Sequence, residues 1–279
     1  MISIIVVTYN RKYLLTKCLE SLLTQNINSA YEIIVIDNGS CDKTTSFIKN
    51  NFLNRIKFIP LHRRTNLRTC KNLGINNCRG KIIAFTDDDC RPSQDWLKNL
   101  ENTLKNYDFI GGAVKLGNKI NFPWWWQPSL NWLIGLQDEV NHKLLPLGSN
   151  VAYRDYVLKP VREMPIRGRF SPLIAKYSQY GEDIDRAAKA LENNFKMGFS
   201  KKAVVFHAIS QSKLRIASLL KRSYREGYFL AKINRKYKTI CQNFLILIIN
   251  PIRFLVTFQL TFLFKTILSF GYFTGLLTR

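Results

Sequence analysis

Three consecutive carboxylates, Asp87, Asp88 and Asp89, end an apolar stretch at residues 81–86. If the triplet is extended, its side chains alternate in direction, so Asp87 and Asp89 share one side and Asp88 faces the other. Two hard oxygen ligands at the end of a buried strand suit Mg²⁺ or Mn²⁺. A polar strand end that caps the helix expected after Pro92 would explain the same residues without a metal. The triplet therefore makes a divalent cation with a phosphate the first candidate chemistry.

A second acidic pair, Glu182 and Asp183, precedes a segment with helical periodicity at residues 184–195. A carboxylate there is a candidate general base, although the helix dipole also favours acids in a first turn for purely structural reasons. His207 ends a strand-like segment at residues 199–206. The helix that begins at Asp183 would be about 20 Å long, and the strand that returns before His207 about 26 Å long. His207 would therefore lie near Asp183. His207 is then either a structural residue or a nitrogen ligand that favours Mn²⁺ over Mg²⁺.

Alternating strands and helices must position these groups. Strands are expected at residues 2–7, 32–36, 56–59 and 81–86, and helices at 11–25, 43–51, 66–78 and 95–105, the last opened by Pro92. This alternation predicts an α/β fold with a mostly parallel sheet flanked by helices. Polar residues follow the first, second and fourth strands, where ligands bind in open α/β sheets.

Composition and missing motifs exclude several classes. The 279 residues are 46% apolar, which is enough for a sizeable core. The start of the chain has no signal-peptide pattern, so we expect the folded part in the cytosol. Six cysteines without paired spacing are expected to be reduced. The first strand is followed by Thr8-Tyr9-Asn10-Arg11, without the glycines of a dinucleotide site, and no Walker loop occurs. Phosphates must therefore be bound through a metal and side chains, which favours a nucleotide-sugar site.

Together these residues resemble the family 2 glycosyltransferases with the GT-A fold, over roughly Ile2 to Ser210. Each motif alone is weak, but their order and spacing are specific. The motifs are Val6–Arg11, Val35–Ser40, Lys71–Ile75 with Gly80, Asp87–Asp89, Gly111–Gly112, Gly148–Asn150 and Gly181–Asp183.

The resemblance implies a domain organisation. Residues 1–100 would form the nucleotide-sugar-binding half and residues 101–212 the acceptor-binding half of one GT-A domain. Beyond the matched region, the composition of residues 213–279 predicts a C-terminal helical tail that associates with a membrane.

It also implies a donor site. Asp37 would recognise the base, usually uracil, because its carboxylate can accept a hydrogen bond from the ring N–H. Alternatively, Asp37 has a structural role and opens an Asp-Asn-Gly-Ser turn. Lys71 stands where an arginine is more usual and Arg68 where a glycine is common, and both keep positive charge near the phosphates. The remaining residues expected to line the donor are Thr8, Asn10, Asp87, Asp88 and Gly112.

The same resemblance assigns catalysis. Asp183 would be the general base, with Glu182 as its neighbour, for an acceptor hydroxyl that attacks the anomeric carbon of the sugar. A single base without a carboxylate nucleophile implies inversion at that carbon. The leaving diphosphate needs a cation, Mn²⁺ or Mg²⁺, for which Asp87, Asp89 and His207 are the predicted ligands.

A tryptophan-rich run lies between the two halves, at residues 122–128, with Trp132 close behind. Tryptophans stack on sugar faces and also settle at membrane interfaces. The run is therefore an acceptor platform, a lipid-facing loop, or a hydrophobic plug that holds an irregular loop.

The C-terminal part is basic and apolar. Residues 213–238 form an expected basic amphipathic surface helix. Residues 244–277 are apolar but interrupted by charges and by Asn250-Pro251, so interfacial or re-entrant helices are favoured. The alternatives are one spanning helix, or a helical pair packed on the domain or in a homodimer. The last 73 residues carry about +11 of the total net charge of +23, and this charge beside an apolar tail fits anionic lipid better than nucleic acid.

We therefore expect an inverting, metal-dependent glycosyltransferase at the cytoplasmic face of the membrane. It would move a sugar from a UDP-linked donor to a glycan or lipid-linked acceptor in cell-surface polysaccharide or glycoconjugate synthesis. The alternative is a non-catalytic, membrane-associated protein that binds nucleotide sugars. A basic nucleic-acid-binding protein is a third reading, for which the sequence offers no recognition motif.

Overall fold

The computed structural model describes residues 1–137, 145–158, 182–233, 250 and 260–277, which fall into two units. The first unit contains the described residues of Met1–Asn118, Gln137–Met164 and Glu182–Ala208, and the second contains the other described residues. Segments of both predicted halves, 1–100 and 101–212, contribute strands to the sheet of the first unit.

A mixed sheet forms the first unit, with the described strands in the order β3-β2-β1-β4-β7-β6-β8-β5. Parallel pairs join β1 to β2 and β4, β2 to β3, and β6 to β8, whereas β4–β7, β6–β7 and β5–β8 are antiparallel. The strand bounds are β1 Ile2–Thr8, β2 Tyr31–Asp37, β3 Lys57–Pro60, β4 Ile82–Asp87, β5 Cys90–Pro92, β6 Phe109–Leu116, β7 Asn150–Arg154 and β8 Met197–His207.

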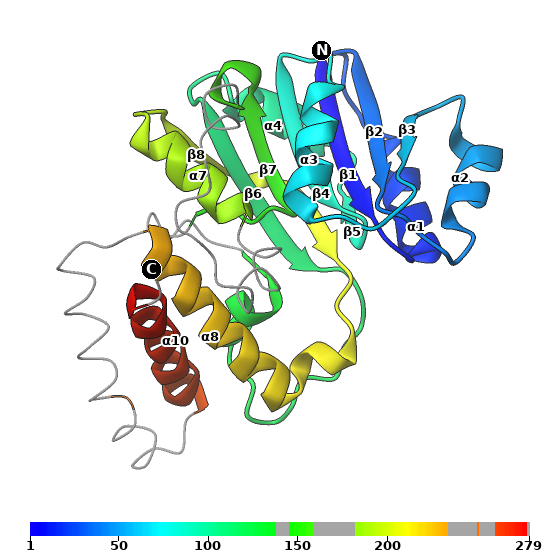
Figure 1. Cartoon of the computed structure of the whole chain (residues 1–279). Helices are drawn as coiled ribbons and strands as arrows, with labels where there is room; N and C mark the ends of the chain where they lie inside the picture. Colours follow the sequence, from blue (N-terminus) through cyan, green and yellow to red (C-terminus); the bar gives the residue numbers. More distant parts are fainter. Residues whose placement is uncertain (138–144, 159–181, 234–249, 251–259, 278–279) are drawn as a thin grey trace. The chain divides into compact units, whose positions relative to one another are not determined.

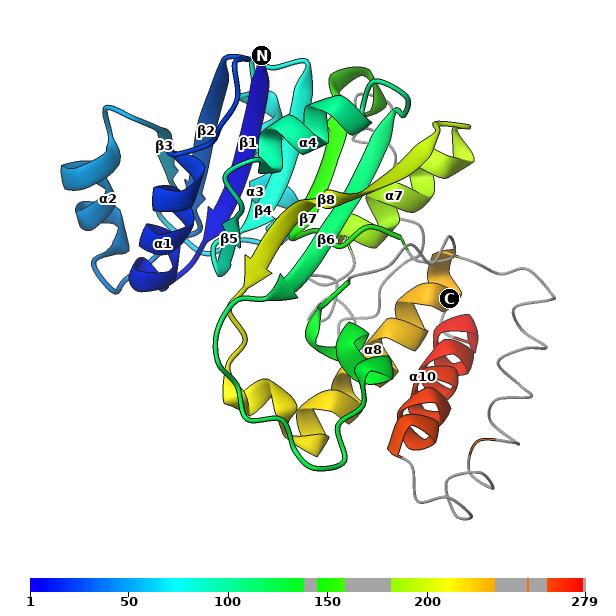
Figure 2. The same cartoon turned by 180° about the vertical axis from the view of Figure 1, so that it is seen from behind.

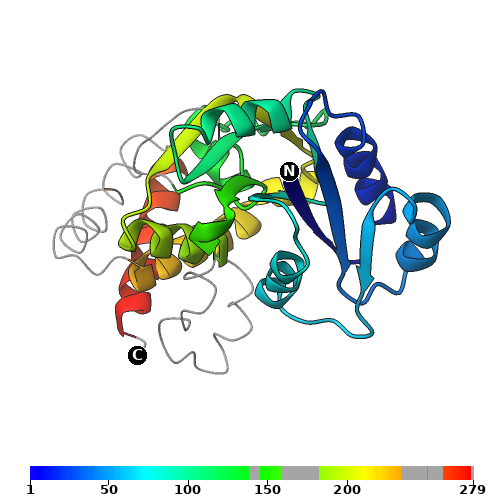
Figure 3. The same ribbon diagram turned by 90° about the horizontal axis from the view of Figure 1, so that it is seen from above.

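Helices cover both faces of this sheet. Figure 1 shows α3 and α7 in front of the strands, and Figure 2 shows α1 and α4 in front after the half-turn. The view from above in Figure 3 shows these two pairs on opposite sides of the sheet. The apolar side chains of α7 and α3 pack on a cluster that includes Phe85, Phe109 and Tyr153. The helix bounds are α1 Lys12–Leu22, α2 Thr44–Phe52, α3 Leu67–Asn76, α4 Trp96–Thr103 and α7 Glu182–Glu192.

The strand registers bring the predicted polar residues to one edge. Thr8 pairs with Asp37 across β1 and β2, and Val7 pairs with Asp87 across β1 and β4. The apolar runs that precede these residues are buried, so the polar groups begin where the sheet ends. The predicted convergence of three strand ends is confirmed.

Two local predictions are wrong. Pro92 does not open a helix: it lies in β5 opposite Val205 of β8, and the helix begins at Trp96. Asp88 and Asp89 do not continue the extended strand, because they form the turn between β4 and β5. The strict alternation of the triplet therefore fails, and a single arginine reaches both Asp88 and Asp89.

The second unit contains the described part of the C-terminal tail. Its elements are η1 Pro128–Ile134, η2 Gln211–Leu214, α8 Ile216–Ile233 and α10 Leu260–Leu277. A methyl group added at Gly227 would lie 1.6 Å from the carbonyl oxygen of Leu268, and one at Gly271 would lie 2.0 Å from that of Tyr224. Only glycine permits this approach, so α8 and α10 pack backbone against backbone (Figure 2).

Parts of the predicted tail, residues 234–249 and 251–259, lie outside the described residues. No helix among the described residues combines the length and apolarity required to cross a membrane. In the tryptophan run, Trp125 lies 6.4 Å from the ring of Phe264 in α10, whereas Trp124 is 96% exposed. One tryptophan therefore packs on a helix of its own unit and the next faces solvent.

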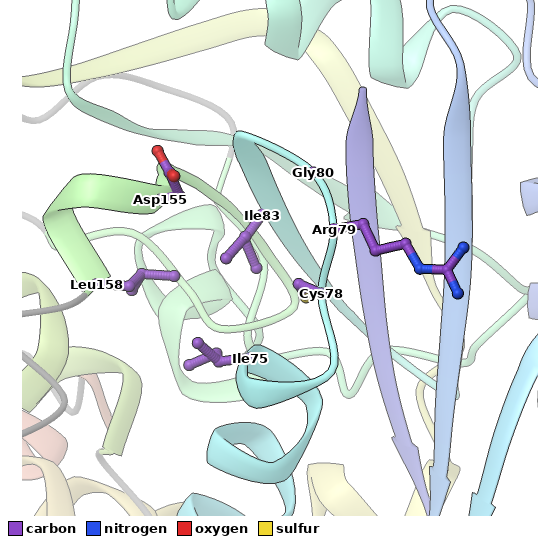
Figure 4. Close-up of a pocket in the computed structure, with 7 residues that line it drawn as sticks. All are labelled: Ile75, Cys78, Arg79, Gly80, Ile83, Asp155 and Leu158. Atoms are coloured by element: carbon purple, nitrogen blue, oxygen red, sulfur yellow. The ribbon is translucent and has the colours of Figure 1, made fainter.

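A cavity of about 180 Å³ lies at the start of β4, at the opposite end of that strand from the Asp triplet. Figure 4 shows Ile75, Ile83 and Leu158 forming its apolar part, while the Arg79 side chain points away from the others. The cavity shares no residue with the predicted site.

Candidate active site

The turn after β4 carries two buried carboxylates tied to the loop after β1. The Asp88 Oδ2 accepts a hydrogen bond of 2.8 Å from the Thr8 hydroxyl. The Arg11 guanidinium donates to Asp88 Oδ1 at 2.9 Å and to Asp89 Oδ2 at 3.1 Å. Burial raises the pKa of Asp88 to about 6, although Arg11 opposes that shift. Thr8 and Asp88, both expected to line the donor, are thus hydrogen-bonded to each other, and Arg11 is a contact that sequence analysis did not assign.

Asp89 and His207 supply the candidate metal donors. The Nε2 of His207 lies 3.6 Å from the Oδ2 of Asp89. Asp87 is close enough for its pKa to respond to the charges of both residues, with burial as the largest effect and raising it. No group of three or more His, Cys, Asp or Glu side chains in a metal-holding arrangement occurs among the described residues. A carboxylate and an imidazole side by side fit a divalent cation that takes its other ligands from phosphate and water.

The loops after β1 and β2 are joined at the predicted nucleotide pocket. Asp37 is fully buried, and its carboxylate accepts hydrogen bonds from the Ser40 N–H at 3.0 Å and from the Thr45 hydroxyl. Asn10, in the left-handed region at φ 52°, accepts from the Cys41 N–H at 2.8 Å. Asp37 therefore holds a turn, and its role toward a base stays a prediction.

A third loop, after β3, joins the same rim. The Asn38 side-chain amide donates to the Thr65 carbonyl oxygen at 2.9 Å and accepts from the Thr65 N–H at 2.8 Å. The Arg64 guanidinium lies 4.3 Å from the centre of the Tyr9 ring, next to Thr8. Sequence analysis missed this loop because no periodic or family motif marks it.

Asp183 is held by the loop that precedes β7. Its Oδ2 accepts the Gly148 N–H at 2.7 Å, and its side chain is only partly buried. A methyl group on Gly148 would lie 2.7 Å from that oxygen, so the contact needs glycine. The predicted role of Asp183 as general base stays a prediction.

Glu182 has a different environment from its neighbour. It is 3% exposed, and its two oxygens lie 2.5 Å from Lys71 Nζ and 2.9 Å from an Arg186 guanidinium nitrogen. Burial alone would raise its pKa, but these two cations lower it to about 2. A carboxylate with so low a pKa, and with a cation on each oxygen, is a weak base.

Gly112 contacts an internal polar residue rather than an open pocket. A methyl group there would lie 2.4 Å from the Asn150 amide nitrogen. That buried amide donates to the carbonyl oxygens of Ala113 and Ala203 and accepts from the Trp96 indole at 2.8 Å. The predicted donor-binding role of Gly112 stays a prediction.

The predicted residues are gathered around Asp87. Its carboxyl interacts electrostatically with Lys71, Asp89, His207 and Asp183, which come from α3, the β4–β5 turn, β8 and α7. One end of the sheet therefore carries the candidate base, the candidate ligands of a divalent cation and the buried Lys71 ammonium.

The chain matches the family model "Glycosyl transferase family 2" over residues 3–161, more than half of its length, and it belongs to this family. It is 31% identical to the glycosyltransferase AglE of Haloferax volcanii over 119 residues, covering 41% of this chain and 39% of that protein. It is 36% identical to the GalNAc(5)-diNAcBac-PP-undecaprenol beta-1,3-glucosyltransferase of Campylobacter jejuni over 120 residues, covering 42% of this chain and 37% of that protein.

A third relative is the dolichyl N-acetyl-alpha-D-glucosaminyl phosphate 3-beta-D-2,3-diacetamido-2,3-dideoxy-beta-D-glucuronosyltransferase of Methanococcus voltae. It is 35% identical over 130 residues, covering 43% of this chain and 40% of that protein. The matched part thus spans less than half of each of these three relatives.

Among solved structures, residues 1–349 of S. aureus TarS in complex with UDP match with a TM-score of 0.55 and 18% identity. The match covers 99% of this chain and 90% of that one. At this identity the likeness establishes the fold, which is GT-A-like as predicted.

Proposed function

We propose that this chain is an inverting glycosyltransferase that uses a divalent cation and a UDP-linked donor. One observation carries the proposal: Asp183 lies within electrostatic reach of Asp87, whose other charged neighbours include Asp89 and His207. The base and the cation ligands of a glycosyl transfer must both reach one sugar, and these residues share one end of the sheet.

Donor and acceptor classes follow from the relatives and from the site. UDP is the nucleotide in the TarS structure, and Asp37 lies at the end of β2, where the resemblance puts base recognition. Two relatives have names that include dolichyl phosphate or PP-undecaprenol, which supports a lipid-linked glycan as acceptor.

The transfer itself needs one proton acceptor. The acceptor hydroxyl gives its proton to Asp183 as its oxygen attacks the anomeric carbon. The bond from that carbon to the diphosphate oxygen breaks, its electron pair leaves with UDP, and the single displacement inverts the centre. A cation held by Asp89 and His207, with Asp87 beside it, would neutralise charge on the leaving diphosphate.

Nucleotide binding tests the donor site. Calorimetry with UDP, GDP, CDP and dTDP, in Mn²⁺ and again in chelator, should give metal-dependent selection of UDP. Asp89→Asn should lose the metal-dependent part, whereas Asp183→Asn should bind UDP normally and lose transfer. Folded protein that binds none of the four nucleotides would refute the proposal.

We also propose that the second unit lies at the cytoplasmic surface of a membrane. The basic side chains of α8 and the exposed Trp124 support contact with anionic headgroups. Cosedimentation should be stronger with vesicles containing phosphatidylglycerol than with pure phosphatidylcholine, and it should weaken with salt. Equal binding to both vesicle types would remove the electrostatic part of this proposal.

A further inference from the structure

The proposed function leaves one buried charge cluster unused. It consists of Lys71 on α3 with Glu182 and Arg186 on α7. The three side chains are at most 5% exposed, and they flank Phe85, whose ring centre lies 5.6 Å from Lys71 Nζ and 5.1 Å from the Arg186 guanidinium carbon. Two cations share one carboxylate, so the cluster carries one excess positive charge.

One cation of this cluster also interacts with the candidate cation site. Besides Glu182, the Lys71 ammonium interacts electrostatically with Asp87 and Asp183. Lys71 thus interacts both with the Glu182 carboxylate, 2.5 Å away, and with carboxylates at the end of the sheet. An ammonium in that position can attract a diphosphate, provided that it remains charged and keeps its direction.

Two effects work against a charged Lys71 with a fixed direction: desolvation and the flexibility of the side chain. Desolvation is the largest single effect on the pKa of Lys71 and lowers it, whereas the Glu182, Asp87 and Asp183 carboxylates together raise it, Glu182 most, so that the net shift is upward. The flexible four-carbon stem of a lysine would otherwise allow several directions. The contact of 2.5 Å between Glu182 and Lys71 removes that freedom.

We propose that Glu182 is a positioning residue for donor binding, which acts by holding the Lys71 ammonium toward the donor diphosphate, and that it is not a second base. This inference rests on the proposed function, because it concerns the same donor site. It separates the roles of two adjacent carboxylates, Glu182 acting on binding and Asp183 on transfer.

The test compares neighbouring substitutions. UDP affinity is measured by calorimetry in Mn²⁺ for the wild type, Glu182→Gln, Asp183→Asn, Lys71→Met and the double variant Lys71→Met/Glu182→Gln. We expect Glu182→Gln to bind UDP at least tenfold more weakly and Asp183→Asn to stay within twofold of the wild type. The double variant should bind no more weakly than Lys71→Met, because Glu182 acts only through Lys71.

A merely structural role would give another pattern. Folded Glu182→Gln that binds UDP like the wild type, or additive losses in the double variant, would overturn the inference. If Glu182→Gln does not fold, Glu182→Gln/Arg186→Gln removes one buried charge of each sign and carries the same test. A wild type without UDP affinity would instead refute the proposed function.

Glu182→Asp provides a further readout. It keeps the negative charge between the two cations but shortens the side chain by one methylene. We expect an affinity between those of the wild type and Glu182→Gln, with an unchanged kcat at saturating donor. A kcat loss as large as that of Asp183→Asn would return Glu182 to the chemistry and contradict the inference.

Discussion

Gly148→Ala tests whether the position of one carboxylate controls transfer. The Gly148 N–H binds the Asp183 Oδ2 at 2.7 Å, and the new methyl group would lie 2.7 Å from that oxygen and 2.9 Å from the Asp183 Cβ. Contacts between carbon atoms are most favourable at about 3.5 Å or more, so the carboxylate must move by roughly half an ångström or more. A displacement of about 1 Å can cost about 100-fold in rate. We therefore expect kcat to fall about 10- to 100-fold, or about 1.4 to 2.7 kcal/mol.

The assay is UDP release with donor and acceptor at saturation, together with UDP affinity, which should stay unchanged. Gly198→Ala is the control, because its methyl group would crowd the Tyr107 ring, a contact outside the candidate site. It should lower stability and leave kcat unchanged. Adding Gly148→Ala to Asp183→Asn should cause no further loss. Wild-type kcat in folded Gly148→Ala would show that the Asp183 position does not limit transfer.

Three other predictions concern stability. Trp96→Phe removes the indole donor of buried Asn150, so chemical denaturation should show a loss of about 1–3 kcal/mol; an unchanged midpoint would mean that the bond contributes nothing. Gly227→Ala forces α8 away from Leu268, so thermal unfolding should begin at a lower temperature, and identical melting would contradict the close packing. The lowered pKa of Glu182 corresponds to about 3 kcal/mol of folding stability, which is fully present above about pH 4.5 and is lost as the pH falls toward 2. Urea titrations between pH 7 and 3 should thus show a smaller pH dependence for Glu182→Gln, and equal slopes would refute the ion pairing.

The sequence predicted β1, β2 and β4 well because their apolar runs are local and largely buried. It assigned no strand to β5, β6 or β7; β5, with three residues, exists only through its pairing with β8. The turn at Asp88 and Asp89 was missed for the same reason, because it forms only when the chain continues into β5 and β5 pairs with β8.

The site was predicted at the level of residues rather than contacts. Asp183 and Glu182 are adjacent, and no sequence pattern distinguishes a carboxylate held by Gly148 from one enclosed by Lys71 and Arg186. Arg11 likewise belonged to a recognised motif, but its two carboxylate partners depend on the sheet register.

Asn150 has a consequence for how such an enzyme can change. Its amide ties the first residue of β7 to Ala113 in β6 and Ala203 in β8, while the Trp96 indole holds it from the other side. Gly148 lies two residues earlier, so the group that orients Asp183 is anchored in the rigid sheet. Under the proposed function, segments outside the sheet can then vary in sequence, and with them the acceptor, while Asp183 keeps its position. The chemistry is thereby separated from the choice of acceptor.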